Sequence, residues 1–214
     1  MTKPPTSSGA TPRDASARPV TGRALARQRL ILLGILAVCA APLVAALLMY
    51  YVFSPPGART NQGELIDPQR PLPALRLATL AGDPYPAEQL KGHWQMVTID
   101  SAACDAHCAA KLHLIRQTRQ AQGKQRDRVG QLWLVSDSAP VSPQLASAYD
   151  ATLMLRADPA ELARLFPPAS GSRIEDHVYL IDPLGNLMMR FPRDPDPRGV
   201  HKDLARLLRA SRIG

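Results

Sequence analysis

The chain has 214 residues, which is enough for one domain of ordinary size with appendages, because domains cluster near ~100 to 200 residues. Its formal net charge is +8, but the first 29 residues carry a net +5 and the remaining 185 carry only +3. No stripe of Lys and Arg interleaved with aromatic residues follows, and aromatic residues make up 5% of the chain, so the footprint of a nucleic-acid binder is missing. We therefore expect no nucleic acid among the partners.

The amino-terminal segments indicate a membrane protein. Residues 1–29 are basic and contain many Pro, Ser and Thr residues, which predicts a disordered tail. Residues 30–53 form an uncharged run, LILLGILAVCAAPLVAALLMYYVF, long enough as a helix to cross the ~30 Å hydrocarbon core of a bilayer. A cleaved signal peptide usually has an apolar core of only ~7 to 15 residues, so the length favours an uncleaved transmembrane helix.

The distribution of charge around this run predicts the orientation of the chain. Arg23, Arg27 and Arg29 precede the run, whereas Arg59 is the first charged residue after it. By the positive-inside rule the tail is cytoplasmic and the rest of the chain extracytoplasmic, which in a bacterial inner (plasma) membrane means periplasmic. Residues 54–73, with several prolines, are expected to form an extended linker before a folded domain at 74–214.

The soluble part alternates between strand and helix patterns. The expected elements are strands at 75–80 and 94–99, a helix from 105 to about 122, strands at 131–136 and 151–155, a helix at 159–166, strands at 177–181 and 187–191, and a helix at 200–210. The turn sequence DPLGN joins the last two strands and suits a hairpin. This order predicts an α/β fold, a thioredoxin-like domain preceded by a single transmembrane helix.

Two of the three cysteines are candidates for chemistry. Cys39 lies in the membrane run and is interpreted as a small apolar residue. Cys104 and Cys108 follow a buried strand and are four residues apart at the start of a predicted helix, so their sulfurs can meet on one face. A helix amino terminus favours the thiolate, which is both a metal ligand and the nucleophile of disulfide exchange. A purely structural disulfide is the third interpretation of this pair.

A third ligand would distinguish metal binding from redox use. His177 opens the strand before the DPLGN hairpin, and in a thioredoxin-like plan that segment approaches the cysteine loop. Two thiolates and one imidazole suit copper better than zinc, which usually needs a fourth donor. His107, between the cysteines, is a further nitrogen donor, although a histidine in such a loop is usually solvated.

At this point the sequence resembles a known family. The segments LKGHWQMVTIDSAACDAHC and DHVYLIDPLGNL, together with the upstream anchor, resemble the Sco (SenC) family of copper-binding assembly factors over roughly residues 72–212. The resemblance implies that Cys104, Cys108 and His177 are copper ligands. It also implies two partners, cytochrome c oxidase subunit II, whose dinuclear copper centre the family helps to assemble, and a copper or thiol donor. The resemblance is to a divergent member, with Ala109 where the family usually has proline and Val178 where it has a small hydroxyl residue.

The sequence thus supports three functional hypotheses. In the first, the chain is a membrane-anchored copper metallochaperone, or thiol-redox assembly factor, for the copper centre of cytochrome c oxidase. In the second it is an enzyme, an extracytoplasmic thiol-disulfide oxidoreductase without metal, in which Cys104 attacks and Cys108 resolves the mixed disulfide. In the third it is a structural protein that retains the fold without the site.

Overall fold

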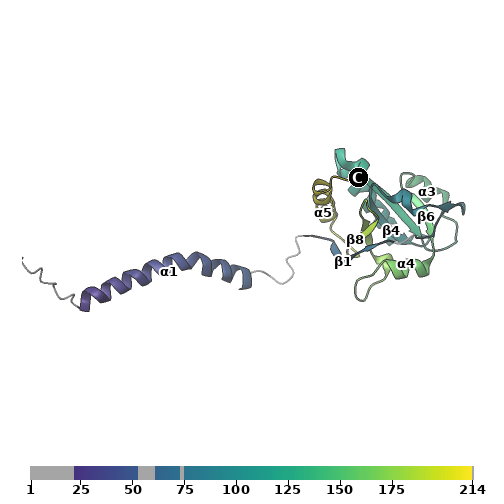
Figure 1. The fold of residues 1–214 in the computed structure, drawn as a ribbon. Coiled ribbons are helices and arrows are strands. Elements are labelled where there is room, and N and C mark those ends of the chain that lie inside the picture. Colours follow the sequence, from purple (N-terminus) through teal and green to yellow (C-terminus); the bar gives the residue numbers. More distant parts are fainter. Residues whose placement is uncertain (1–21, 53–60, 73–74, 214) are drawn as a thin grey trace, which may run out of the picture. The chain divides into compact units, whose positions relative to one another are not determined.

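The computed structural model describes residues 22–52, 61–72 and 75–213. The chain divides into two compact units, residues 1–58 and 59–214. The first unit contains helix α1 (Gly22–Val52), and the second contains all the strands and the other helices (Figure 1).

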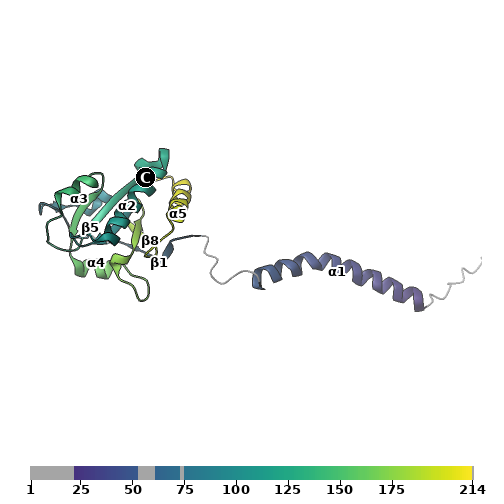
Figure 2. The same cartoon turned by 180° about the vertical axis from the view of Figure 1, so that it is seen from behind.

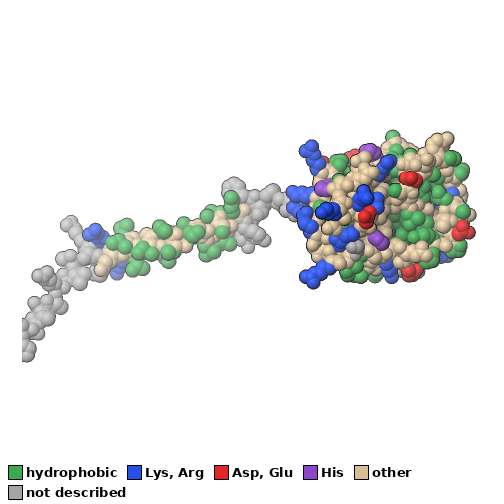
Figure 3. Space-filling model, turned by 90° about the horizontal axis from the view of Figure 1, so that it is seen from above, with side chains coloured by type: hydrophobic (Ala, Val, Ile, Leu, Met, Phe, Trp, Pro, Cys, Tyr) green, Lys and Arg blue, Asp and Glu red, His purple; other side chains and the backbone are tan. Residues whose placement is uncertain are grey.

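Helix α1 has the composition of a membrane helix. The segment Ala26–Met49 is long and apolar enough to cross a membrane, although a signal sequence near the amino terminus would have the same properties. Its side chains are almost all exposed, and Figure 3 shows apolar side chains along its length with basic side chains at its start. The helix begins at Gly22, so residues 22–29 are helical rather than part of a disordered tail, and residues 1–21 lie outside the described residues.

The second unit is built on one eight-stranded sheet with the order β1-β8-β7-β4-β5-β6-β2-β3. The strands are β1 (Glu64–Pro71), β2 (Leu77–Thr79), β3 (Pro84–Tyr85), β4 (Trp94–Asp100), β5 (Val129–Val135), β6 (Leu153–Ala157), β7 (Val178–Ile181) and β8 (Asn186–Arg190). Strands β4, β5 and β6 are parallel, whereas β7 runs antiparallel to β4 and forms a hairpin with β8. This confirms the mixed α/β thioredoxin-like fold.

Helices cover both faces of the sheet (Figures 1 and 2). The helices of this unit are α2 (Ala106–Ala121), α3 (Pro143–Ala148), α4 (Pro159–Leu165) and α5 (Pro197–Ala210). Helices α2 and α5 contribute to one hydrophobic core, together with the side chains that β4, β5 and β7 direct to that face. Helix α4 contributes to a second core on the opposite face.

The alternation of side chains along each strand decides which core a residue joins. In β7, Val178 and Leu180 lie in the core with α2, whereas Tyr179 and Ile181 lie in the core with α4. Strand β4 is buried on both faces, as expected for a central strand in a sheet covered on both sides. Its carboxyl end at Asp100 therefore provides a rigid platform for the loop that carries the cysteines.

One segment differs from the sequence-based expectation. Residues 64–71 fall within the predicted linker 54–73, but they form β1, which pairs with β8 at the edge of the sheet. Two contacts explain the pairing: the side chain of Ile66 is buried, and Asp203 of α5 accepts hydrogen bonds from the backbone N–H groups of Gln62 and Gly63 at 2.6 and 2.9 Å. The prolines of this segment masked its strand pattern.

Candidate functional site: the cysteine turn

The cysteines lie in the turn between the central strand and helix α2. The backbone N–H of Ala102 donates to the carboxylate of Asp137, 3.2 Å away, which anchors the start of the turn to the loop after β5. Cys104 has a φ of 41°, a left-handed conformation that is rare for a residue with a side chain. Asp105 then caps α2, since its side chain accepts a hydrogen bond of 2.9 Å from the N–H of Cys108.

This cap also affects the charge at the site. The hydrogen bond from the Cys108 N–H holds the pKa of the Asp105 carboxyl below its ordinary value, so the cap is ionised at neutral pH. The cap and the helix amino terminus thus have opposite effects on a nearby thiolate, because the helix end attracts negative charge and the carboxylate repels it.

Cys104 and Cys108 are joined by a disulfide, with their Cα atoms 5.1 Å apart. The two sulfurs differ in access. Cys108 is completely buried against the core under α2, whereas Cys104 is partly exposed. A partner thiol therefore reaches the bond from the side of Cys104, and Cys108 is the inner cysteine.

A buried lysine lies next to the inner cysteine. Lys111 follows Cys108 by three residues on α2 and is only 3% exposed, so both side chains face the sheet. Its ammonium group contacts the carboxylate of Asp100 at 2.7 Å and donates to the backbone carbonyls of Ile99, at 3.1 Å, and Glu175. The lysine thus connects the end of β4, helix α2 and the short 3-10 helix η3 (Ile174–Asp176).

His177 lies on the other face of the sheet. It directly precedes β7, and its ring makes an edge contact with Tyr179, which belongs to the core under α4. Both ring nitrogens are engaged: Nδ1 is 2.8 Å from the carbonyl of Phe191, and Nε2 is 2.7 Å from the hydroxyl of Ser172 and accepts a bond of 3.3 Å from the N–H of Ala169. Burial lowers the pKa of the imidazole, which favours the neutral ring.

The structure therefore brings Cys104 and Cys108 together but does not bring His177 to them. Because side chains alternate along a strand, Val178 packs on the cysteine face and its neighbour His177 does not. Among the residues that the structure describes, no cluster of three or more His, Cys, Asp or Glu side chains is arranged to hold a metal ion. The copper site predicted from Cys104, Cys108 and His177 is not assembled in the disulfide form.

His107 is the imidazole beside the cysteines. It lies in the first turn of α2, directly before Cys108, and its Nε2 atom is buried without a hydrogen-bond partner in the described part of the chain. The residue also lines an open hollow of about 230 Å³ together with Lys111 and Arg193. The sequence-based view of His107 as a solvated side chain thus misses a buried nitrogen that has no hydrogen-bond partner among the described residues.

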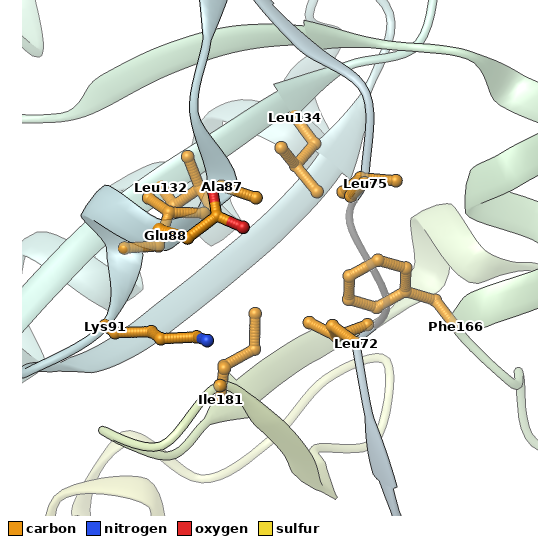
Figure 4. Close-up of a pocket in the computed structure, with 11 residues that line it drawn as sticks. Leu72, Leu75, Ala87, Glu88, Lys91, Leu132, Leu134, Phe166 and Ile181 are labelled. Carbon is orange, nitrogen blue, oxygen red and sulfur yellow. The ribbon is translucent and has the colours of Figure 1, made fainter.

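An apolar hollow lies away from the cysteines. It measures about 130 Å³ and lies on the sheet face opposite α2, where Leu132, Leu134, Phe166 and Ile181 line it and the side chain of Lys91 points toward it (Figure 4). No cysteine or histidine lines it, so it is not part of the candidate site.

Sequence reasoning missed Lys111 and Asp100, although a signal for them was present. Cys108, Lys111, Leu112 and Ile115 recur at helical spacing, and the other three form the apolar stripe of α2. A charged residue inside such a stripe needs a buried partner. The only acid at the end of the preceding strand, Asp100, was available for that role.

Solved structures with the same fold include several Sco proteins. Yeast Sco1 with copper bound is 16% identical, with a TM-score of 0.53 and coverage of 65% of this chain and 92% of that one. Apo Sco1 from Thermus thermophilus is 17% identical, with a TM-score of 0.52 and coverage of 72% and 98%. ScoI from Arabidopsis thaliana with copper bound is 14% identical, with a TM-score of 0.51 and coverage of 65% and 98%. At these identities the likeness shows a shared fold, and it confirms the structural resemblance to the Sco/SenC proteins.

Comparison with curated protein sequences gives no significant match. One family model matches residues 94–211, a segment that starts at the central strand β4 and includes the cysteine turn, Lys111, His177 and helix α5. The match covers more than half of the chain. The chain therefore belongs to the family described as the transmembrane-like, thioredoxin-like, C-terminal domain.

Proposed function

We propose that the chain is a membrane-anchored thiol-disulfide redox protein that acts in the assembly of a copper centre, that of cytochrome c oxidase subunit II. The disulfide between a partly exposed Cys104 and a buried Cys108, at the amino terminus of a helix that follows the central strand, carries the proposal. The resemblance to Sco proteins described above supports the oxidase as the target. Its donor is a reducing thiol protein on the same side of the membrane.

The location follows the charge distribution. Helix α1 anchors the protein in a bacterial inner membrane, with residues 1–29 in the cytoplasm and the domain in the periplasm. In that oxidising compartment the cysteines of a copper site form disulfides and must be reduced before they can bind metal. A tethered dithiol provides this reduction close to a membrane-bound target.

The reaction is a two-electron exchange. In the reduced protein the Cys104 thiolate attacks one sulfur of the target disulfide, and the other target sulfur leaves as a thiolate. Cys108 then attacks Cys104 Sγ, which forms the intramolecular disulfide and releases the second target thiolate. The target gains two electrons and two protons and becomes a dithiol, and the Cys104–Cys108 pair becomes the disulfide seen here.

Trapping of a mixed disulfide tests this assignment. The full-length chain in detergent, with Cys39→Ala to remove the thiol in α1, would be reduced and mixed with the oxidised soluble domain of cytochrome c oxidase subunit II. We expect Cys108→Ser to accumulate a mixed disulfide through Cys104, because the resolving thiol is missing. Cys104→Ser should accumulate none, because the remaining thiol is buried.

The matched pair of serine variants makes the outcome decisive. Equal trapping by both variants would contradict the assigned roles of the two cysteines. Failure of the unsubstituted Cys104–Cys108 pair to reduce the target, with the disulfide itself still reducible by dithiothreitol, would leave a structural disulfide as the better interpretation.

Copper carriage by the reduced cysteines is a second candidate, with copper as the cargo. The unpartnered Nε2 of His107 favours it, since two thiolates and one adjacent imidazole form a donor set suited to copper. The sequence-based prediction instead names His177 as the third ligand. That residue would first have to give up its hydrogen bonds to Ser172 and Phe191.

Titration with Cu(I) under reducing, anaerobic conditions distinguishes these ligand sets. If copper is carried by the set around the turn, His107→Ala should weaken binding about tenfold or more and His177→Ala should not, because only His107 has a free nitrogen beside the cysteines. The reverse order would support the ligand set of Cys104, Cys108 and His177. Binding that survives loss of either cysteine would exclude both sets.

A further inference from the structure

We propose that Lys111 is a positioning residue for disulfide exchange: its ammonium group stabilises Cys108 as a thiolate, and so as the leaving group, when a thiol attacks Cys104. This inference rests on the proposed redox function and deepens it. It assigns a role to a buried ion pair that folding alone does not require, since an apolar residue at position 111 would continue the stripe of α2.

The placement of the charge supports this role. Cys108 and Lys111 are three residues apart on α2, both face the sheet, and both are almost completely buried. Side chains at this spacing have Cβ atoms roughly 5 to 6 Å apart. A positive charge that is held on the buried face of the helix acts more strongly on a developing thiolate on the same face than it would in water.

The ammonium group cannot turn away from this position. Three oxygen atoms from two segments hold it: the Asp100 carboxylate and the Ile99 carbonyl at the end of β4, and the Glu175 carbonyl in η3. Asp100 is 14% exposed at its side chain and Lys111 is 3% exposed, so solvent screens the outer carboxylate more than the inner ammonium. The positive member of the pair is thus on the helix that carries Cys108, and the negative member is at the end of β4.

The positive charge of Lys111 assists the step in which a donor thiolate breaks the Cys104–Cys108 bond. When a thiolate of a donor protein attacks Cys104 Sγ, a new sulfur–sulfur bond forms and the Cys104–Cys108 bond breaks. The electron pair of the broken bond stays on Cys108, which becomes a buried thiolate. A second donor thiolate then releases Cys104, so the donor dithiol is oxidised to a disulfide and this protein is reduced. Burial alone would make the Cys108 thiolate costly, and Lys111 offsets that cost.

Two substitutions separate this electrostatic role from a structural one. Lys111→Met removes the positive charge and leaves Asp100 unpaired, whereas Asp100→Asn removes the negative charge and leaves the ammonium held by carbonyls. Both changes damage the same ion pair, so a purely structural role predicts similar effects of both. An electrostatic role predicts opposite effects on the Cys108 thiolate.

The experiment uses the full-length chain in detergent with Cys39→Ala and Cys104→Ser, so that Cys108 is the single thiol. The thiolate fraction would be followed by ultraviolet absorbance as a function of pH. We expect Lys111→Met to move the midpoint to higher pH by about one unit, equivalent to about a tenfold loss of thiolate below the midpoint, and Asp100→Asn to move it to lower pH. Lys202→Met, an exposed lysine on α5, is the matched control and should leave the midpoint unchanged.

The same substitutions, made in the chain that retains both cysteines, test whether the charge of Lys111 affects the rate of disulfide exchange. Reduction of the disulfide by dithiothreitol should slow about tenfold in Lys111→Met and accelerate in Asp100→Asn. Midpoints that shift in the same direction in both variants, or that do not shift in folded variants, would overturn the proposal. If Lys111→Met does not fold, Asp100→Asn with Lys111→Arg, which retains the charge, decides the question. Because dithiothreitol replaces the biological donor, the test is independent of whether the oxidase is the target.

Discussion

At the scale of single residues, the two histidines differ from the sequence-based prediction. His177, the predicted ligand, is held by hydrogen bonds away from the cysteines, whereas His107 lies beside them with a nitrogen that has no partner in the described part of the chain. His107 directly precedes Cys108, and His177 directly precedes β7, the strand that pairs with β4. The pairing of the two cysteines could be predicted from the sequence because they are only four residues apart, Cys104 just before the cap of α2 and Cys108 in its first turn. The face to which His177 points could not, because it depends on the register of β7, which one residue of slip would reverse.

The buried imidazole of His177 predicts a dependence of stability on pH. Because burial lowers its pKa in the folded protein, the unfolded chain binds more protons below the ordinary histidine pKa of 6.5. The contribution of the neutral ring is therefore fully present above pH 6.5 and is lost as the pH falls through the lower, folded-state pKa. Urea unfolding at pH 7.5 and pH 5.5 should show less stability at the lower pH.

A substitution isolates this effect. His177→Gln retains a side chain that can form hydrogen bonds but does not titrate, so the loss of stability between the two pH values should become smaller. His113→Gln, an exposed histidine on α2, is the control and should lose as much stability as the unsubstituted chain. An unchanged loss in His177→Gln would show that other groups cause the pH dependence.

At the scale of elements, local signals predicted the helices well. Asp158, expected to cap a helix at 159–166, accepts a hydrogen bond from the N–H of Ala160 at the start of α4. The turn sequence DPLGN does join β7 and β8, and Gly185 has the positive φ of 92° that such a turn favours. These features depend on neighbouring residues, which a sequence pattern contains.

Strand β1 could not be predicted in this way, because its stability comes from distant residues. The N–H groups of Gln62 and Gly63 bind Asp203, about 140 residues later in the chain. Gly63 also packs so closely against Met189 and Phe191 that a Cβ atom would collide with both side chains. The eight residues of β1, which include two prolines, do not by themselves predict these contacts.

The carboxylate of Asp203 is expected to hold this edge of the sheet. Asp203→Ala leaves two backbone donors without their acceptor and should destabilise the domain by about 2 to 3 kcal/mol, as measured by urea unfolding. Hydrogen exchange should accelerate at the amides of Gln62 and Gly63 before it does in β4. Asp196→Ala, which removes the exposed cap of the same helix, is the comparison and should leave exchange at Gln62 and Gly63 unchanged. Similar exchange in both variants would contradict the proposed role of Asp203.

At the scale of the whole molecule, the fold could be predicted from the sequence more fully than the site. The thioredoxin-like domain and the apolar helix were predictable because hydrophobic patterns extend over many residues. The family match and the Sco structures agree with that fold. The chemistry depends on a few side chains whose neighbours are brought together only by tertiary structure, such as Lys111 and the carbonyl of Glu175. A shared fold therefore leaves room for a redox protein and a copper carrier on the same framework.

The backbone of Cys104 has a consequence for protein engineering and evolution. A residue with a side chain costs about 1 kcal/mol or more in the left-handed region, whereas glycine is accommodated there without that cost. A variant library selected only for thermal stability under reducing conditions should therefore replace Cys104 by glycine or asparagine. A library selected for thiol-disulfide exchange should retain the cysteine. The identity of this one residue would thus report which property was under selection.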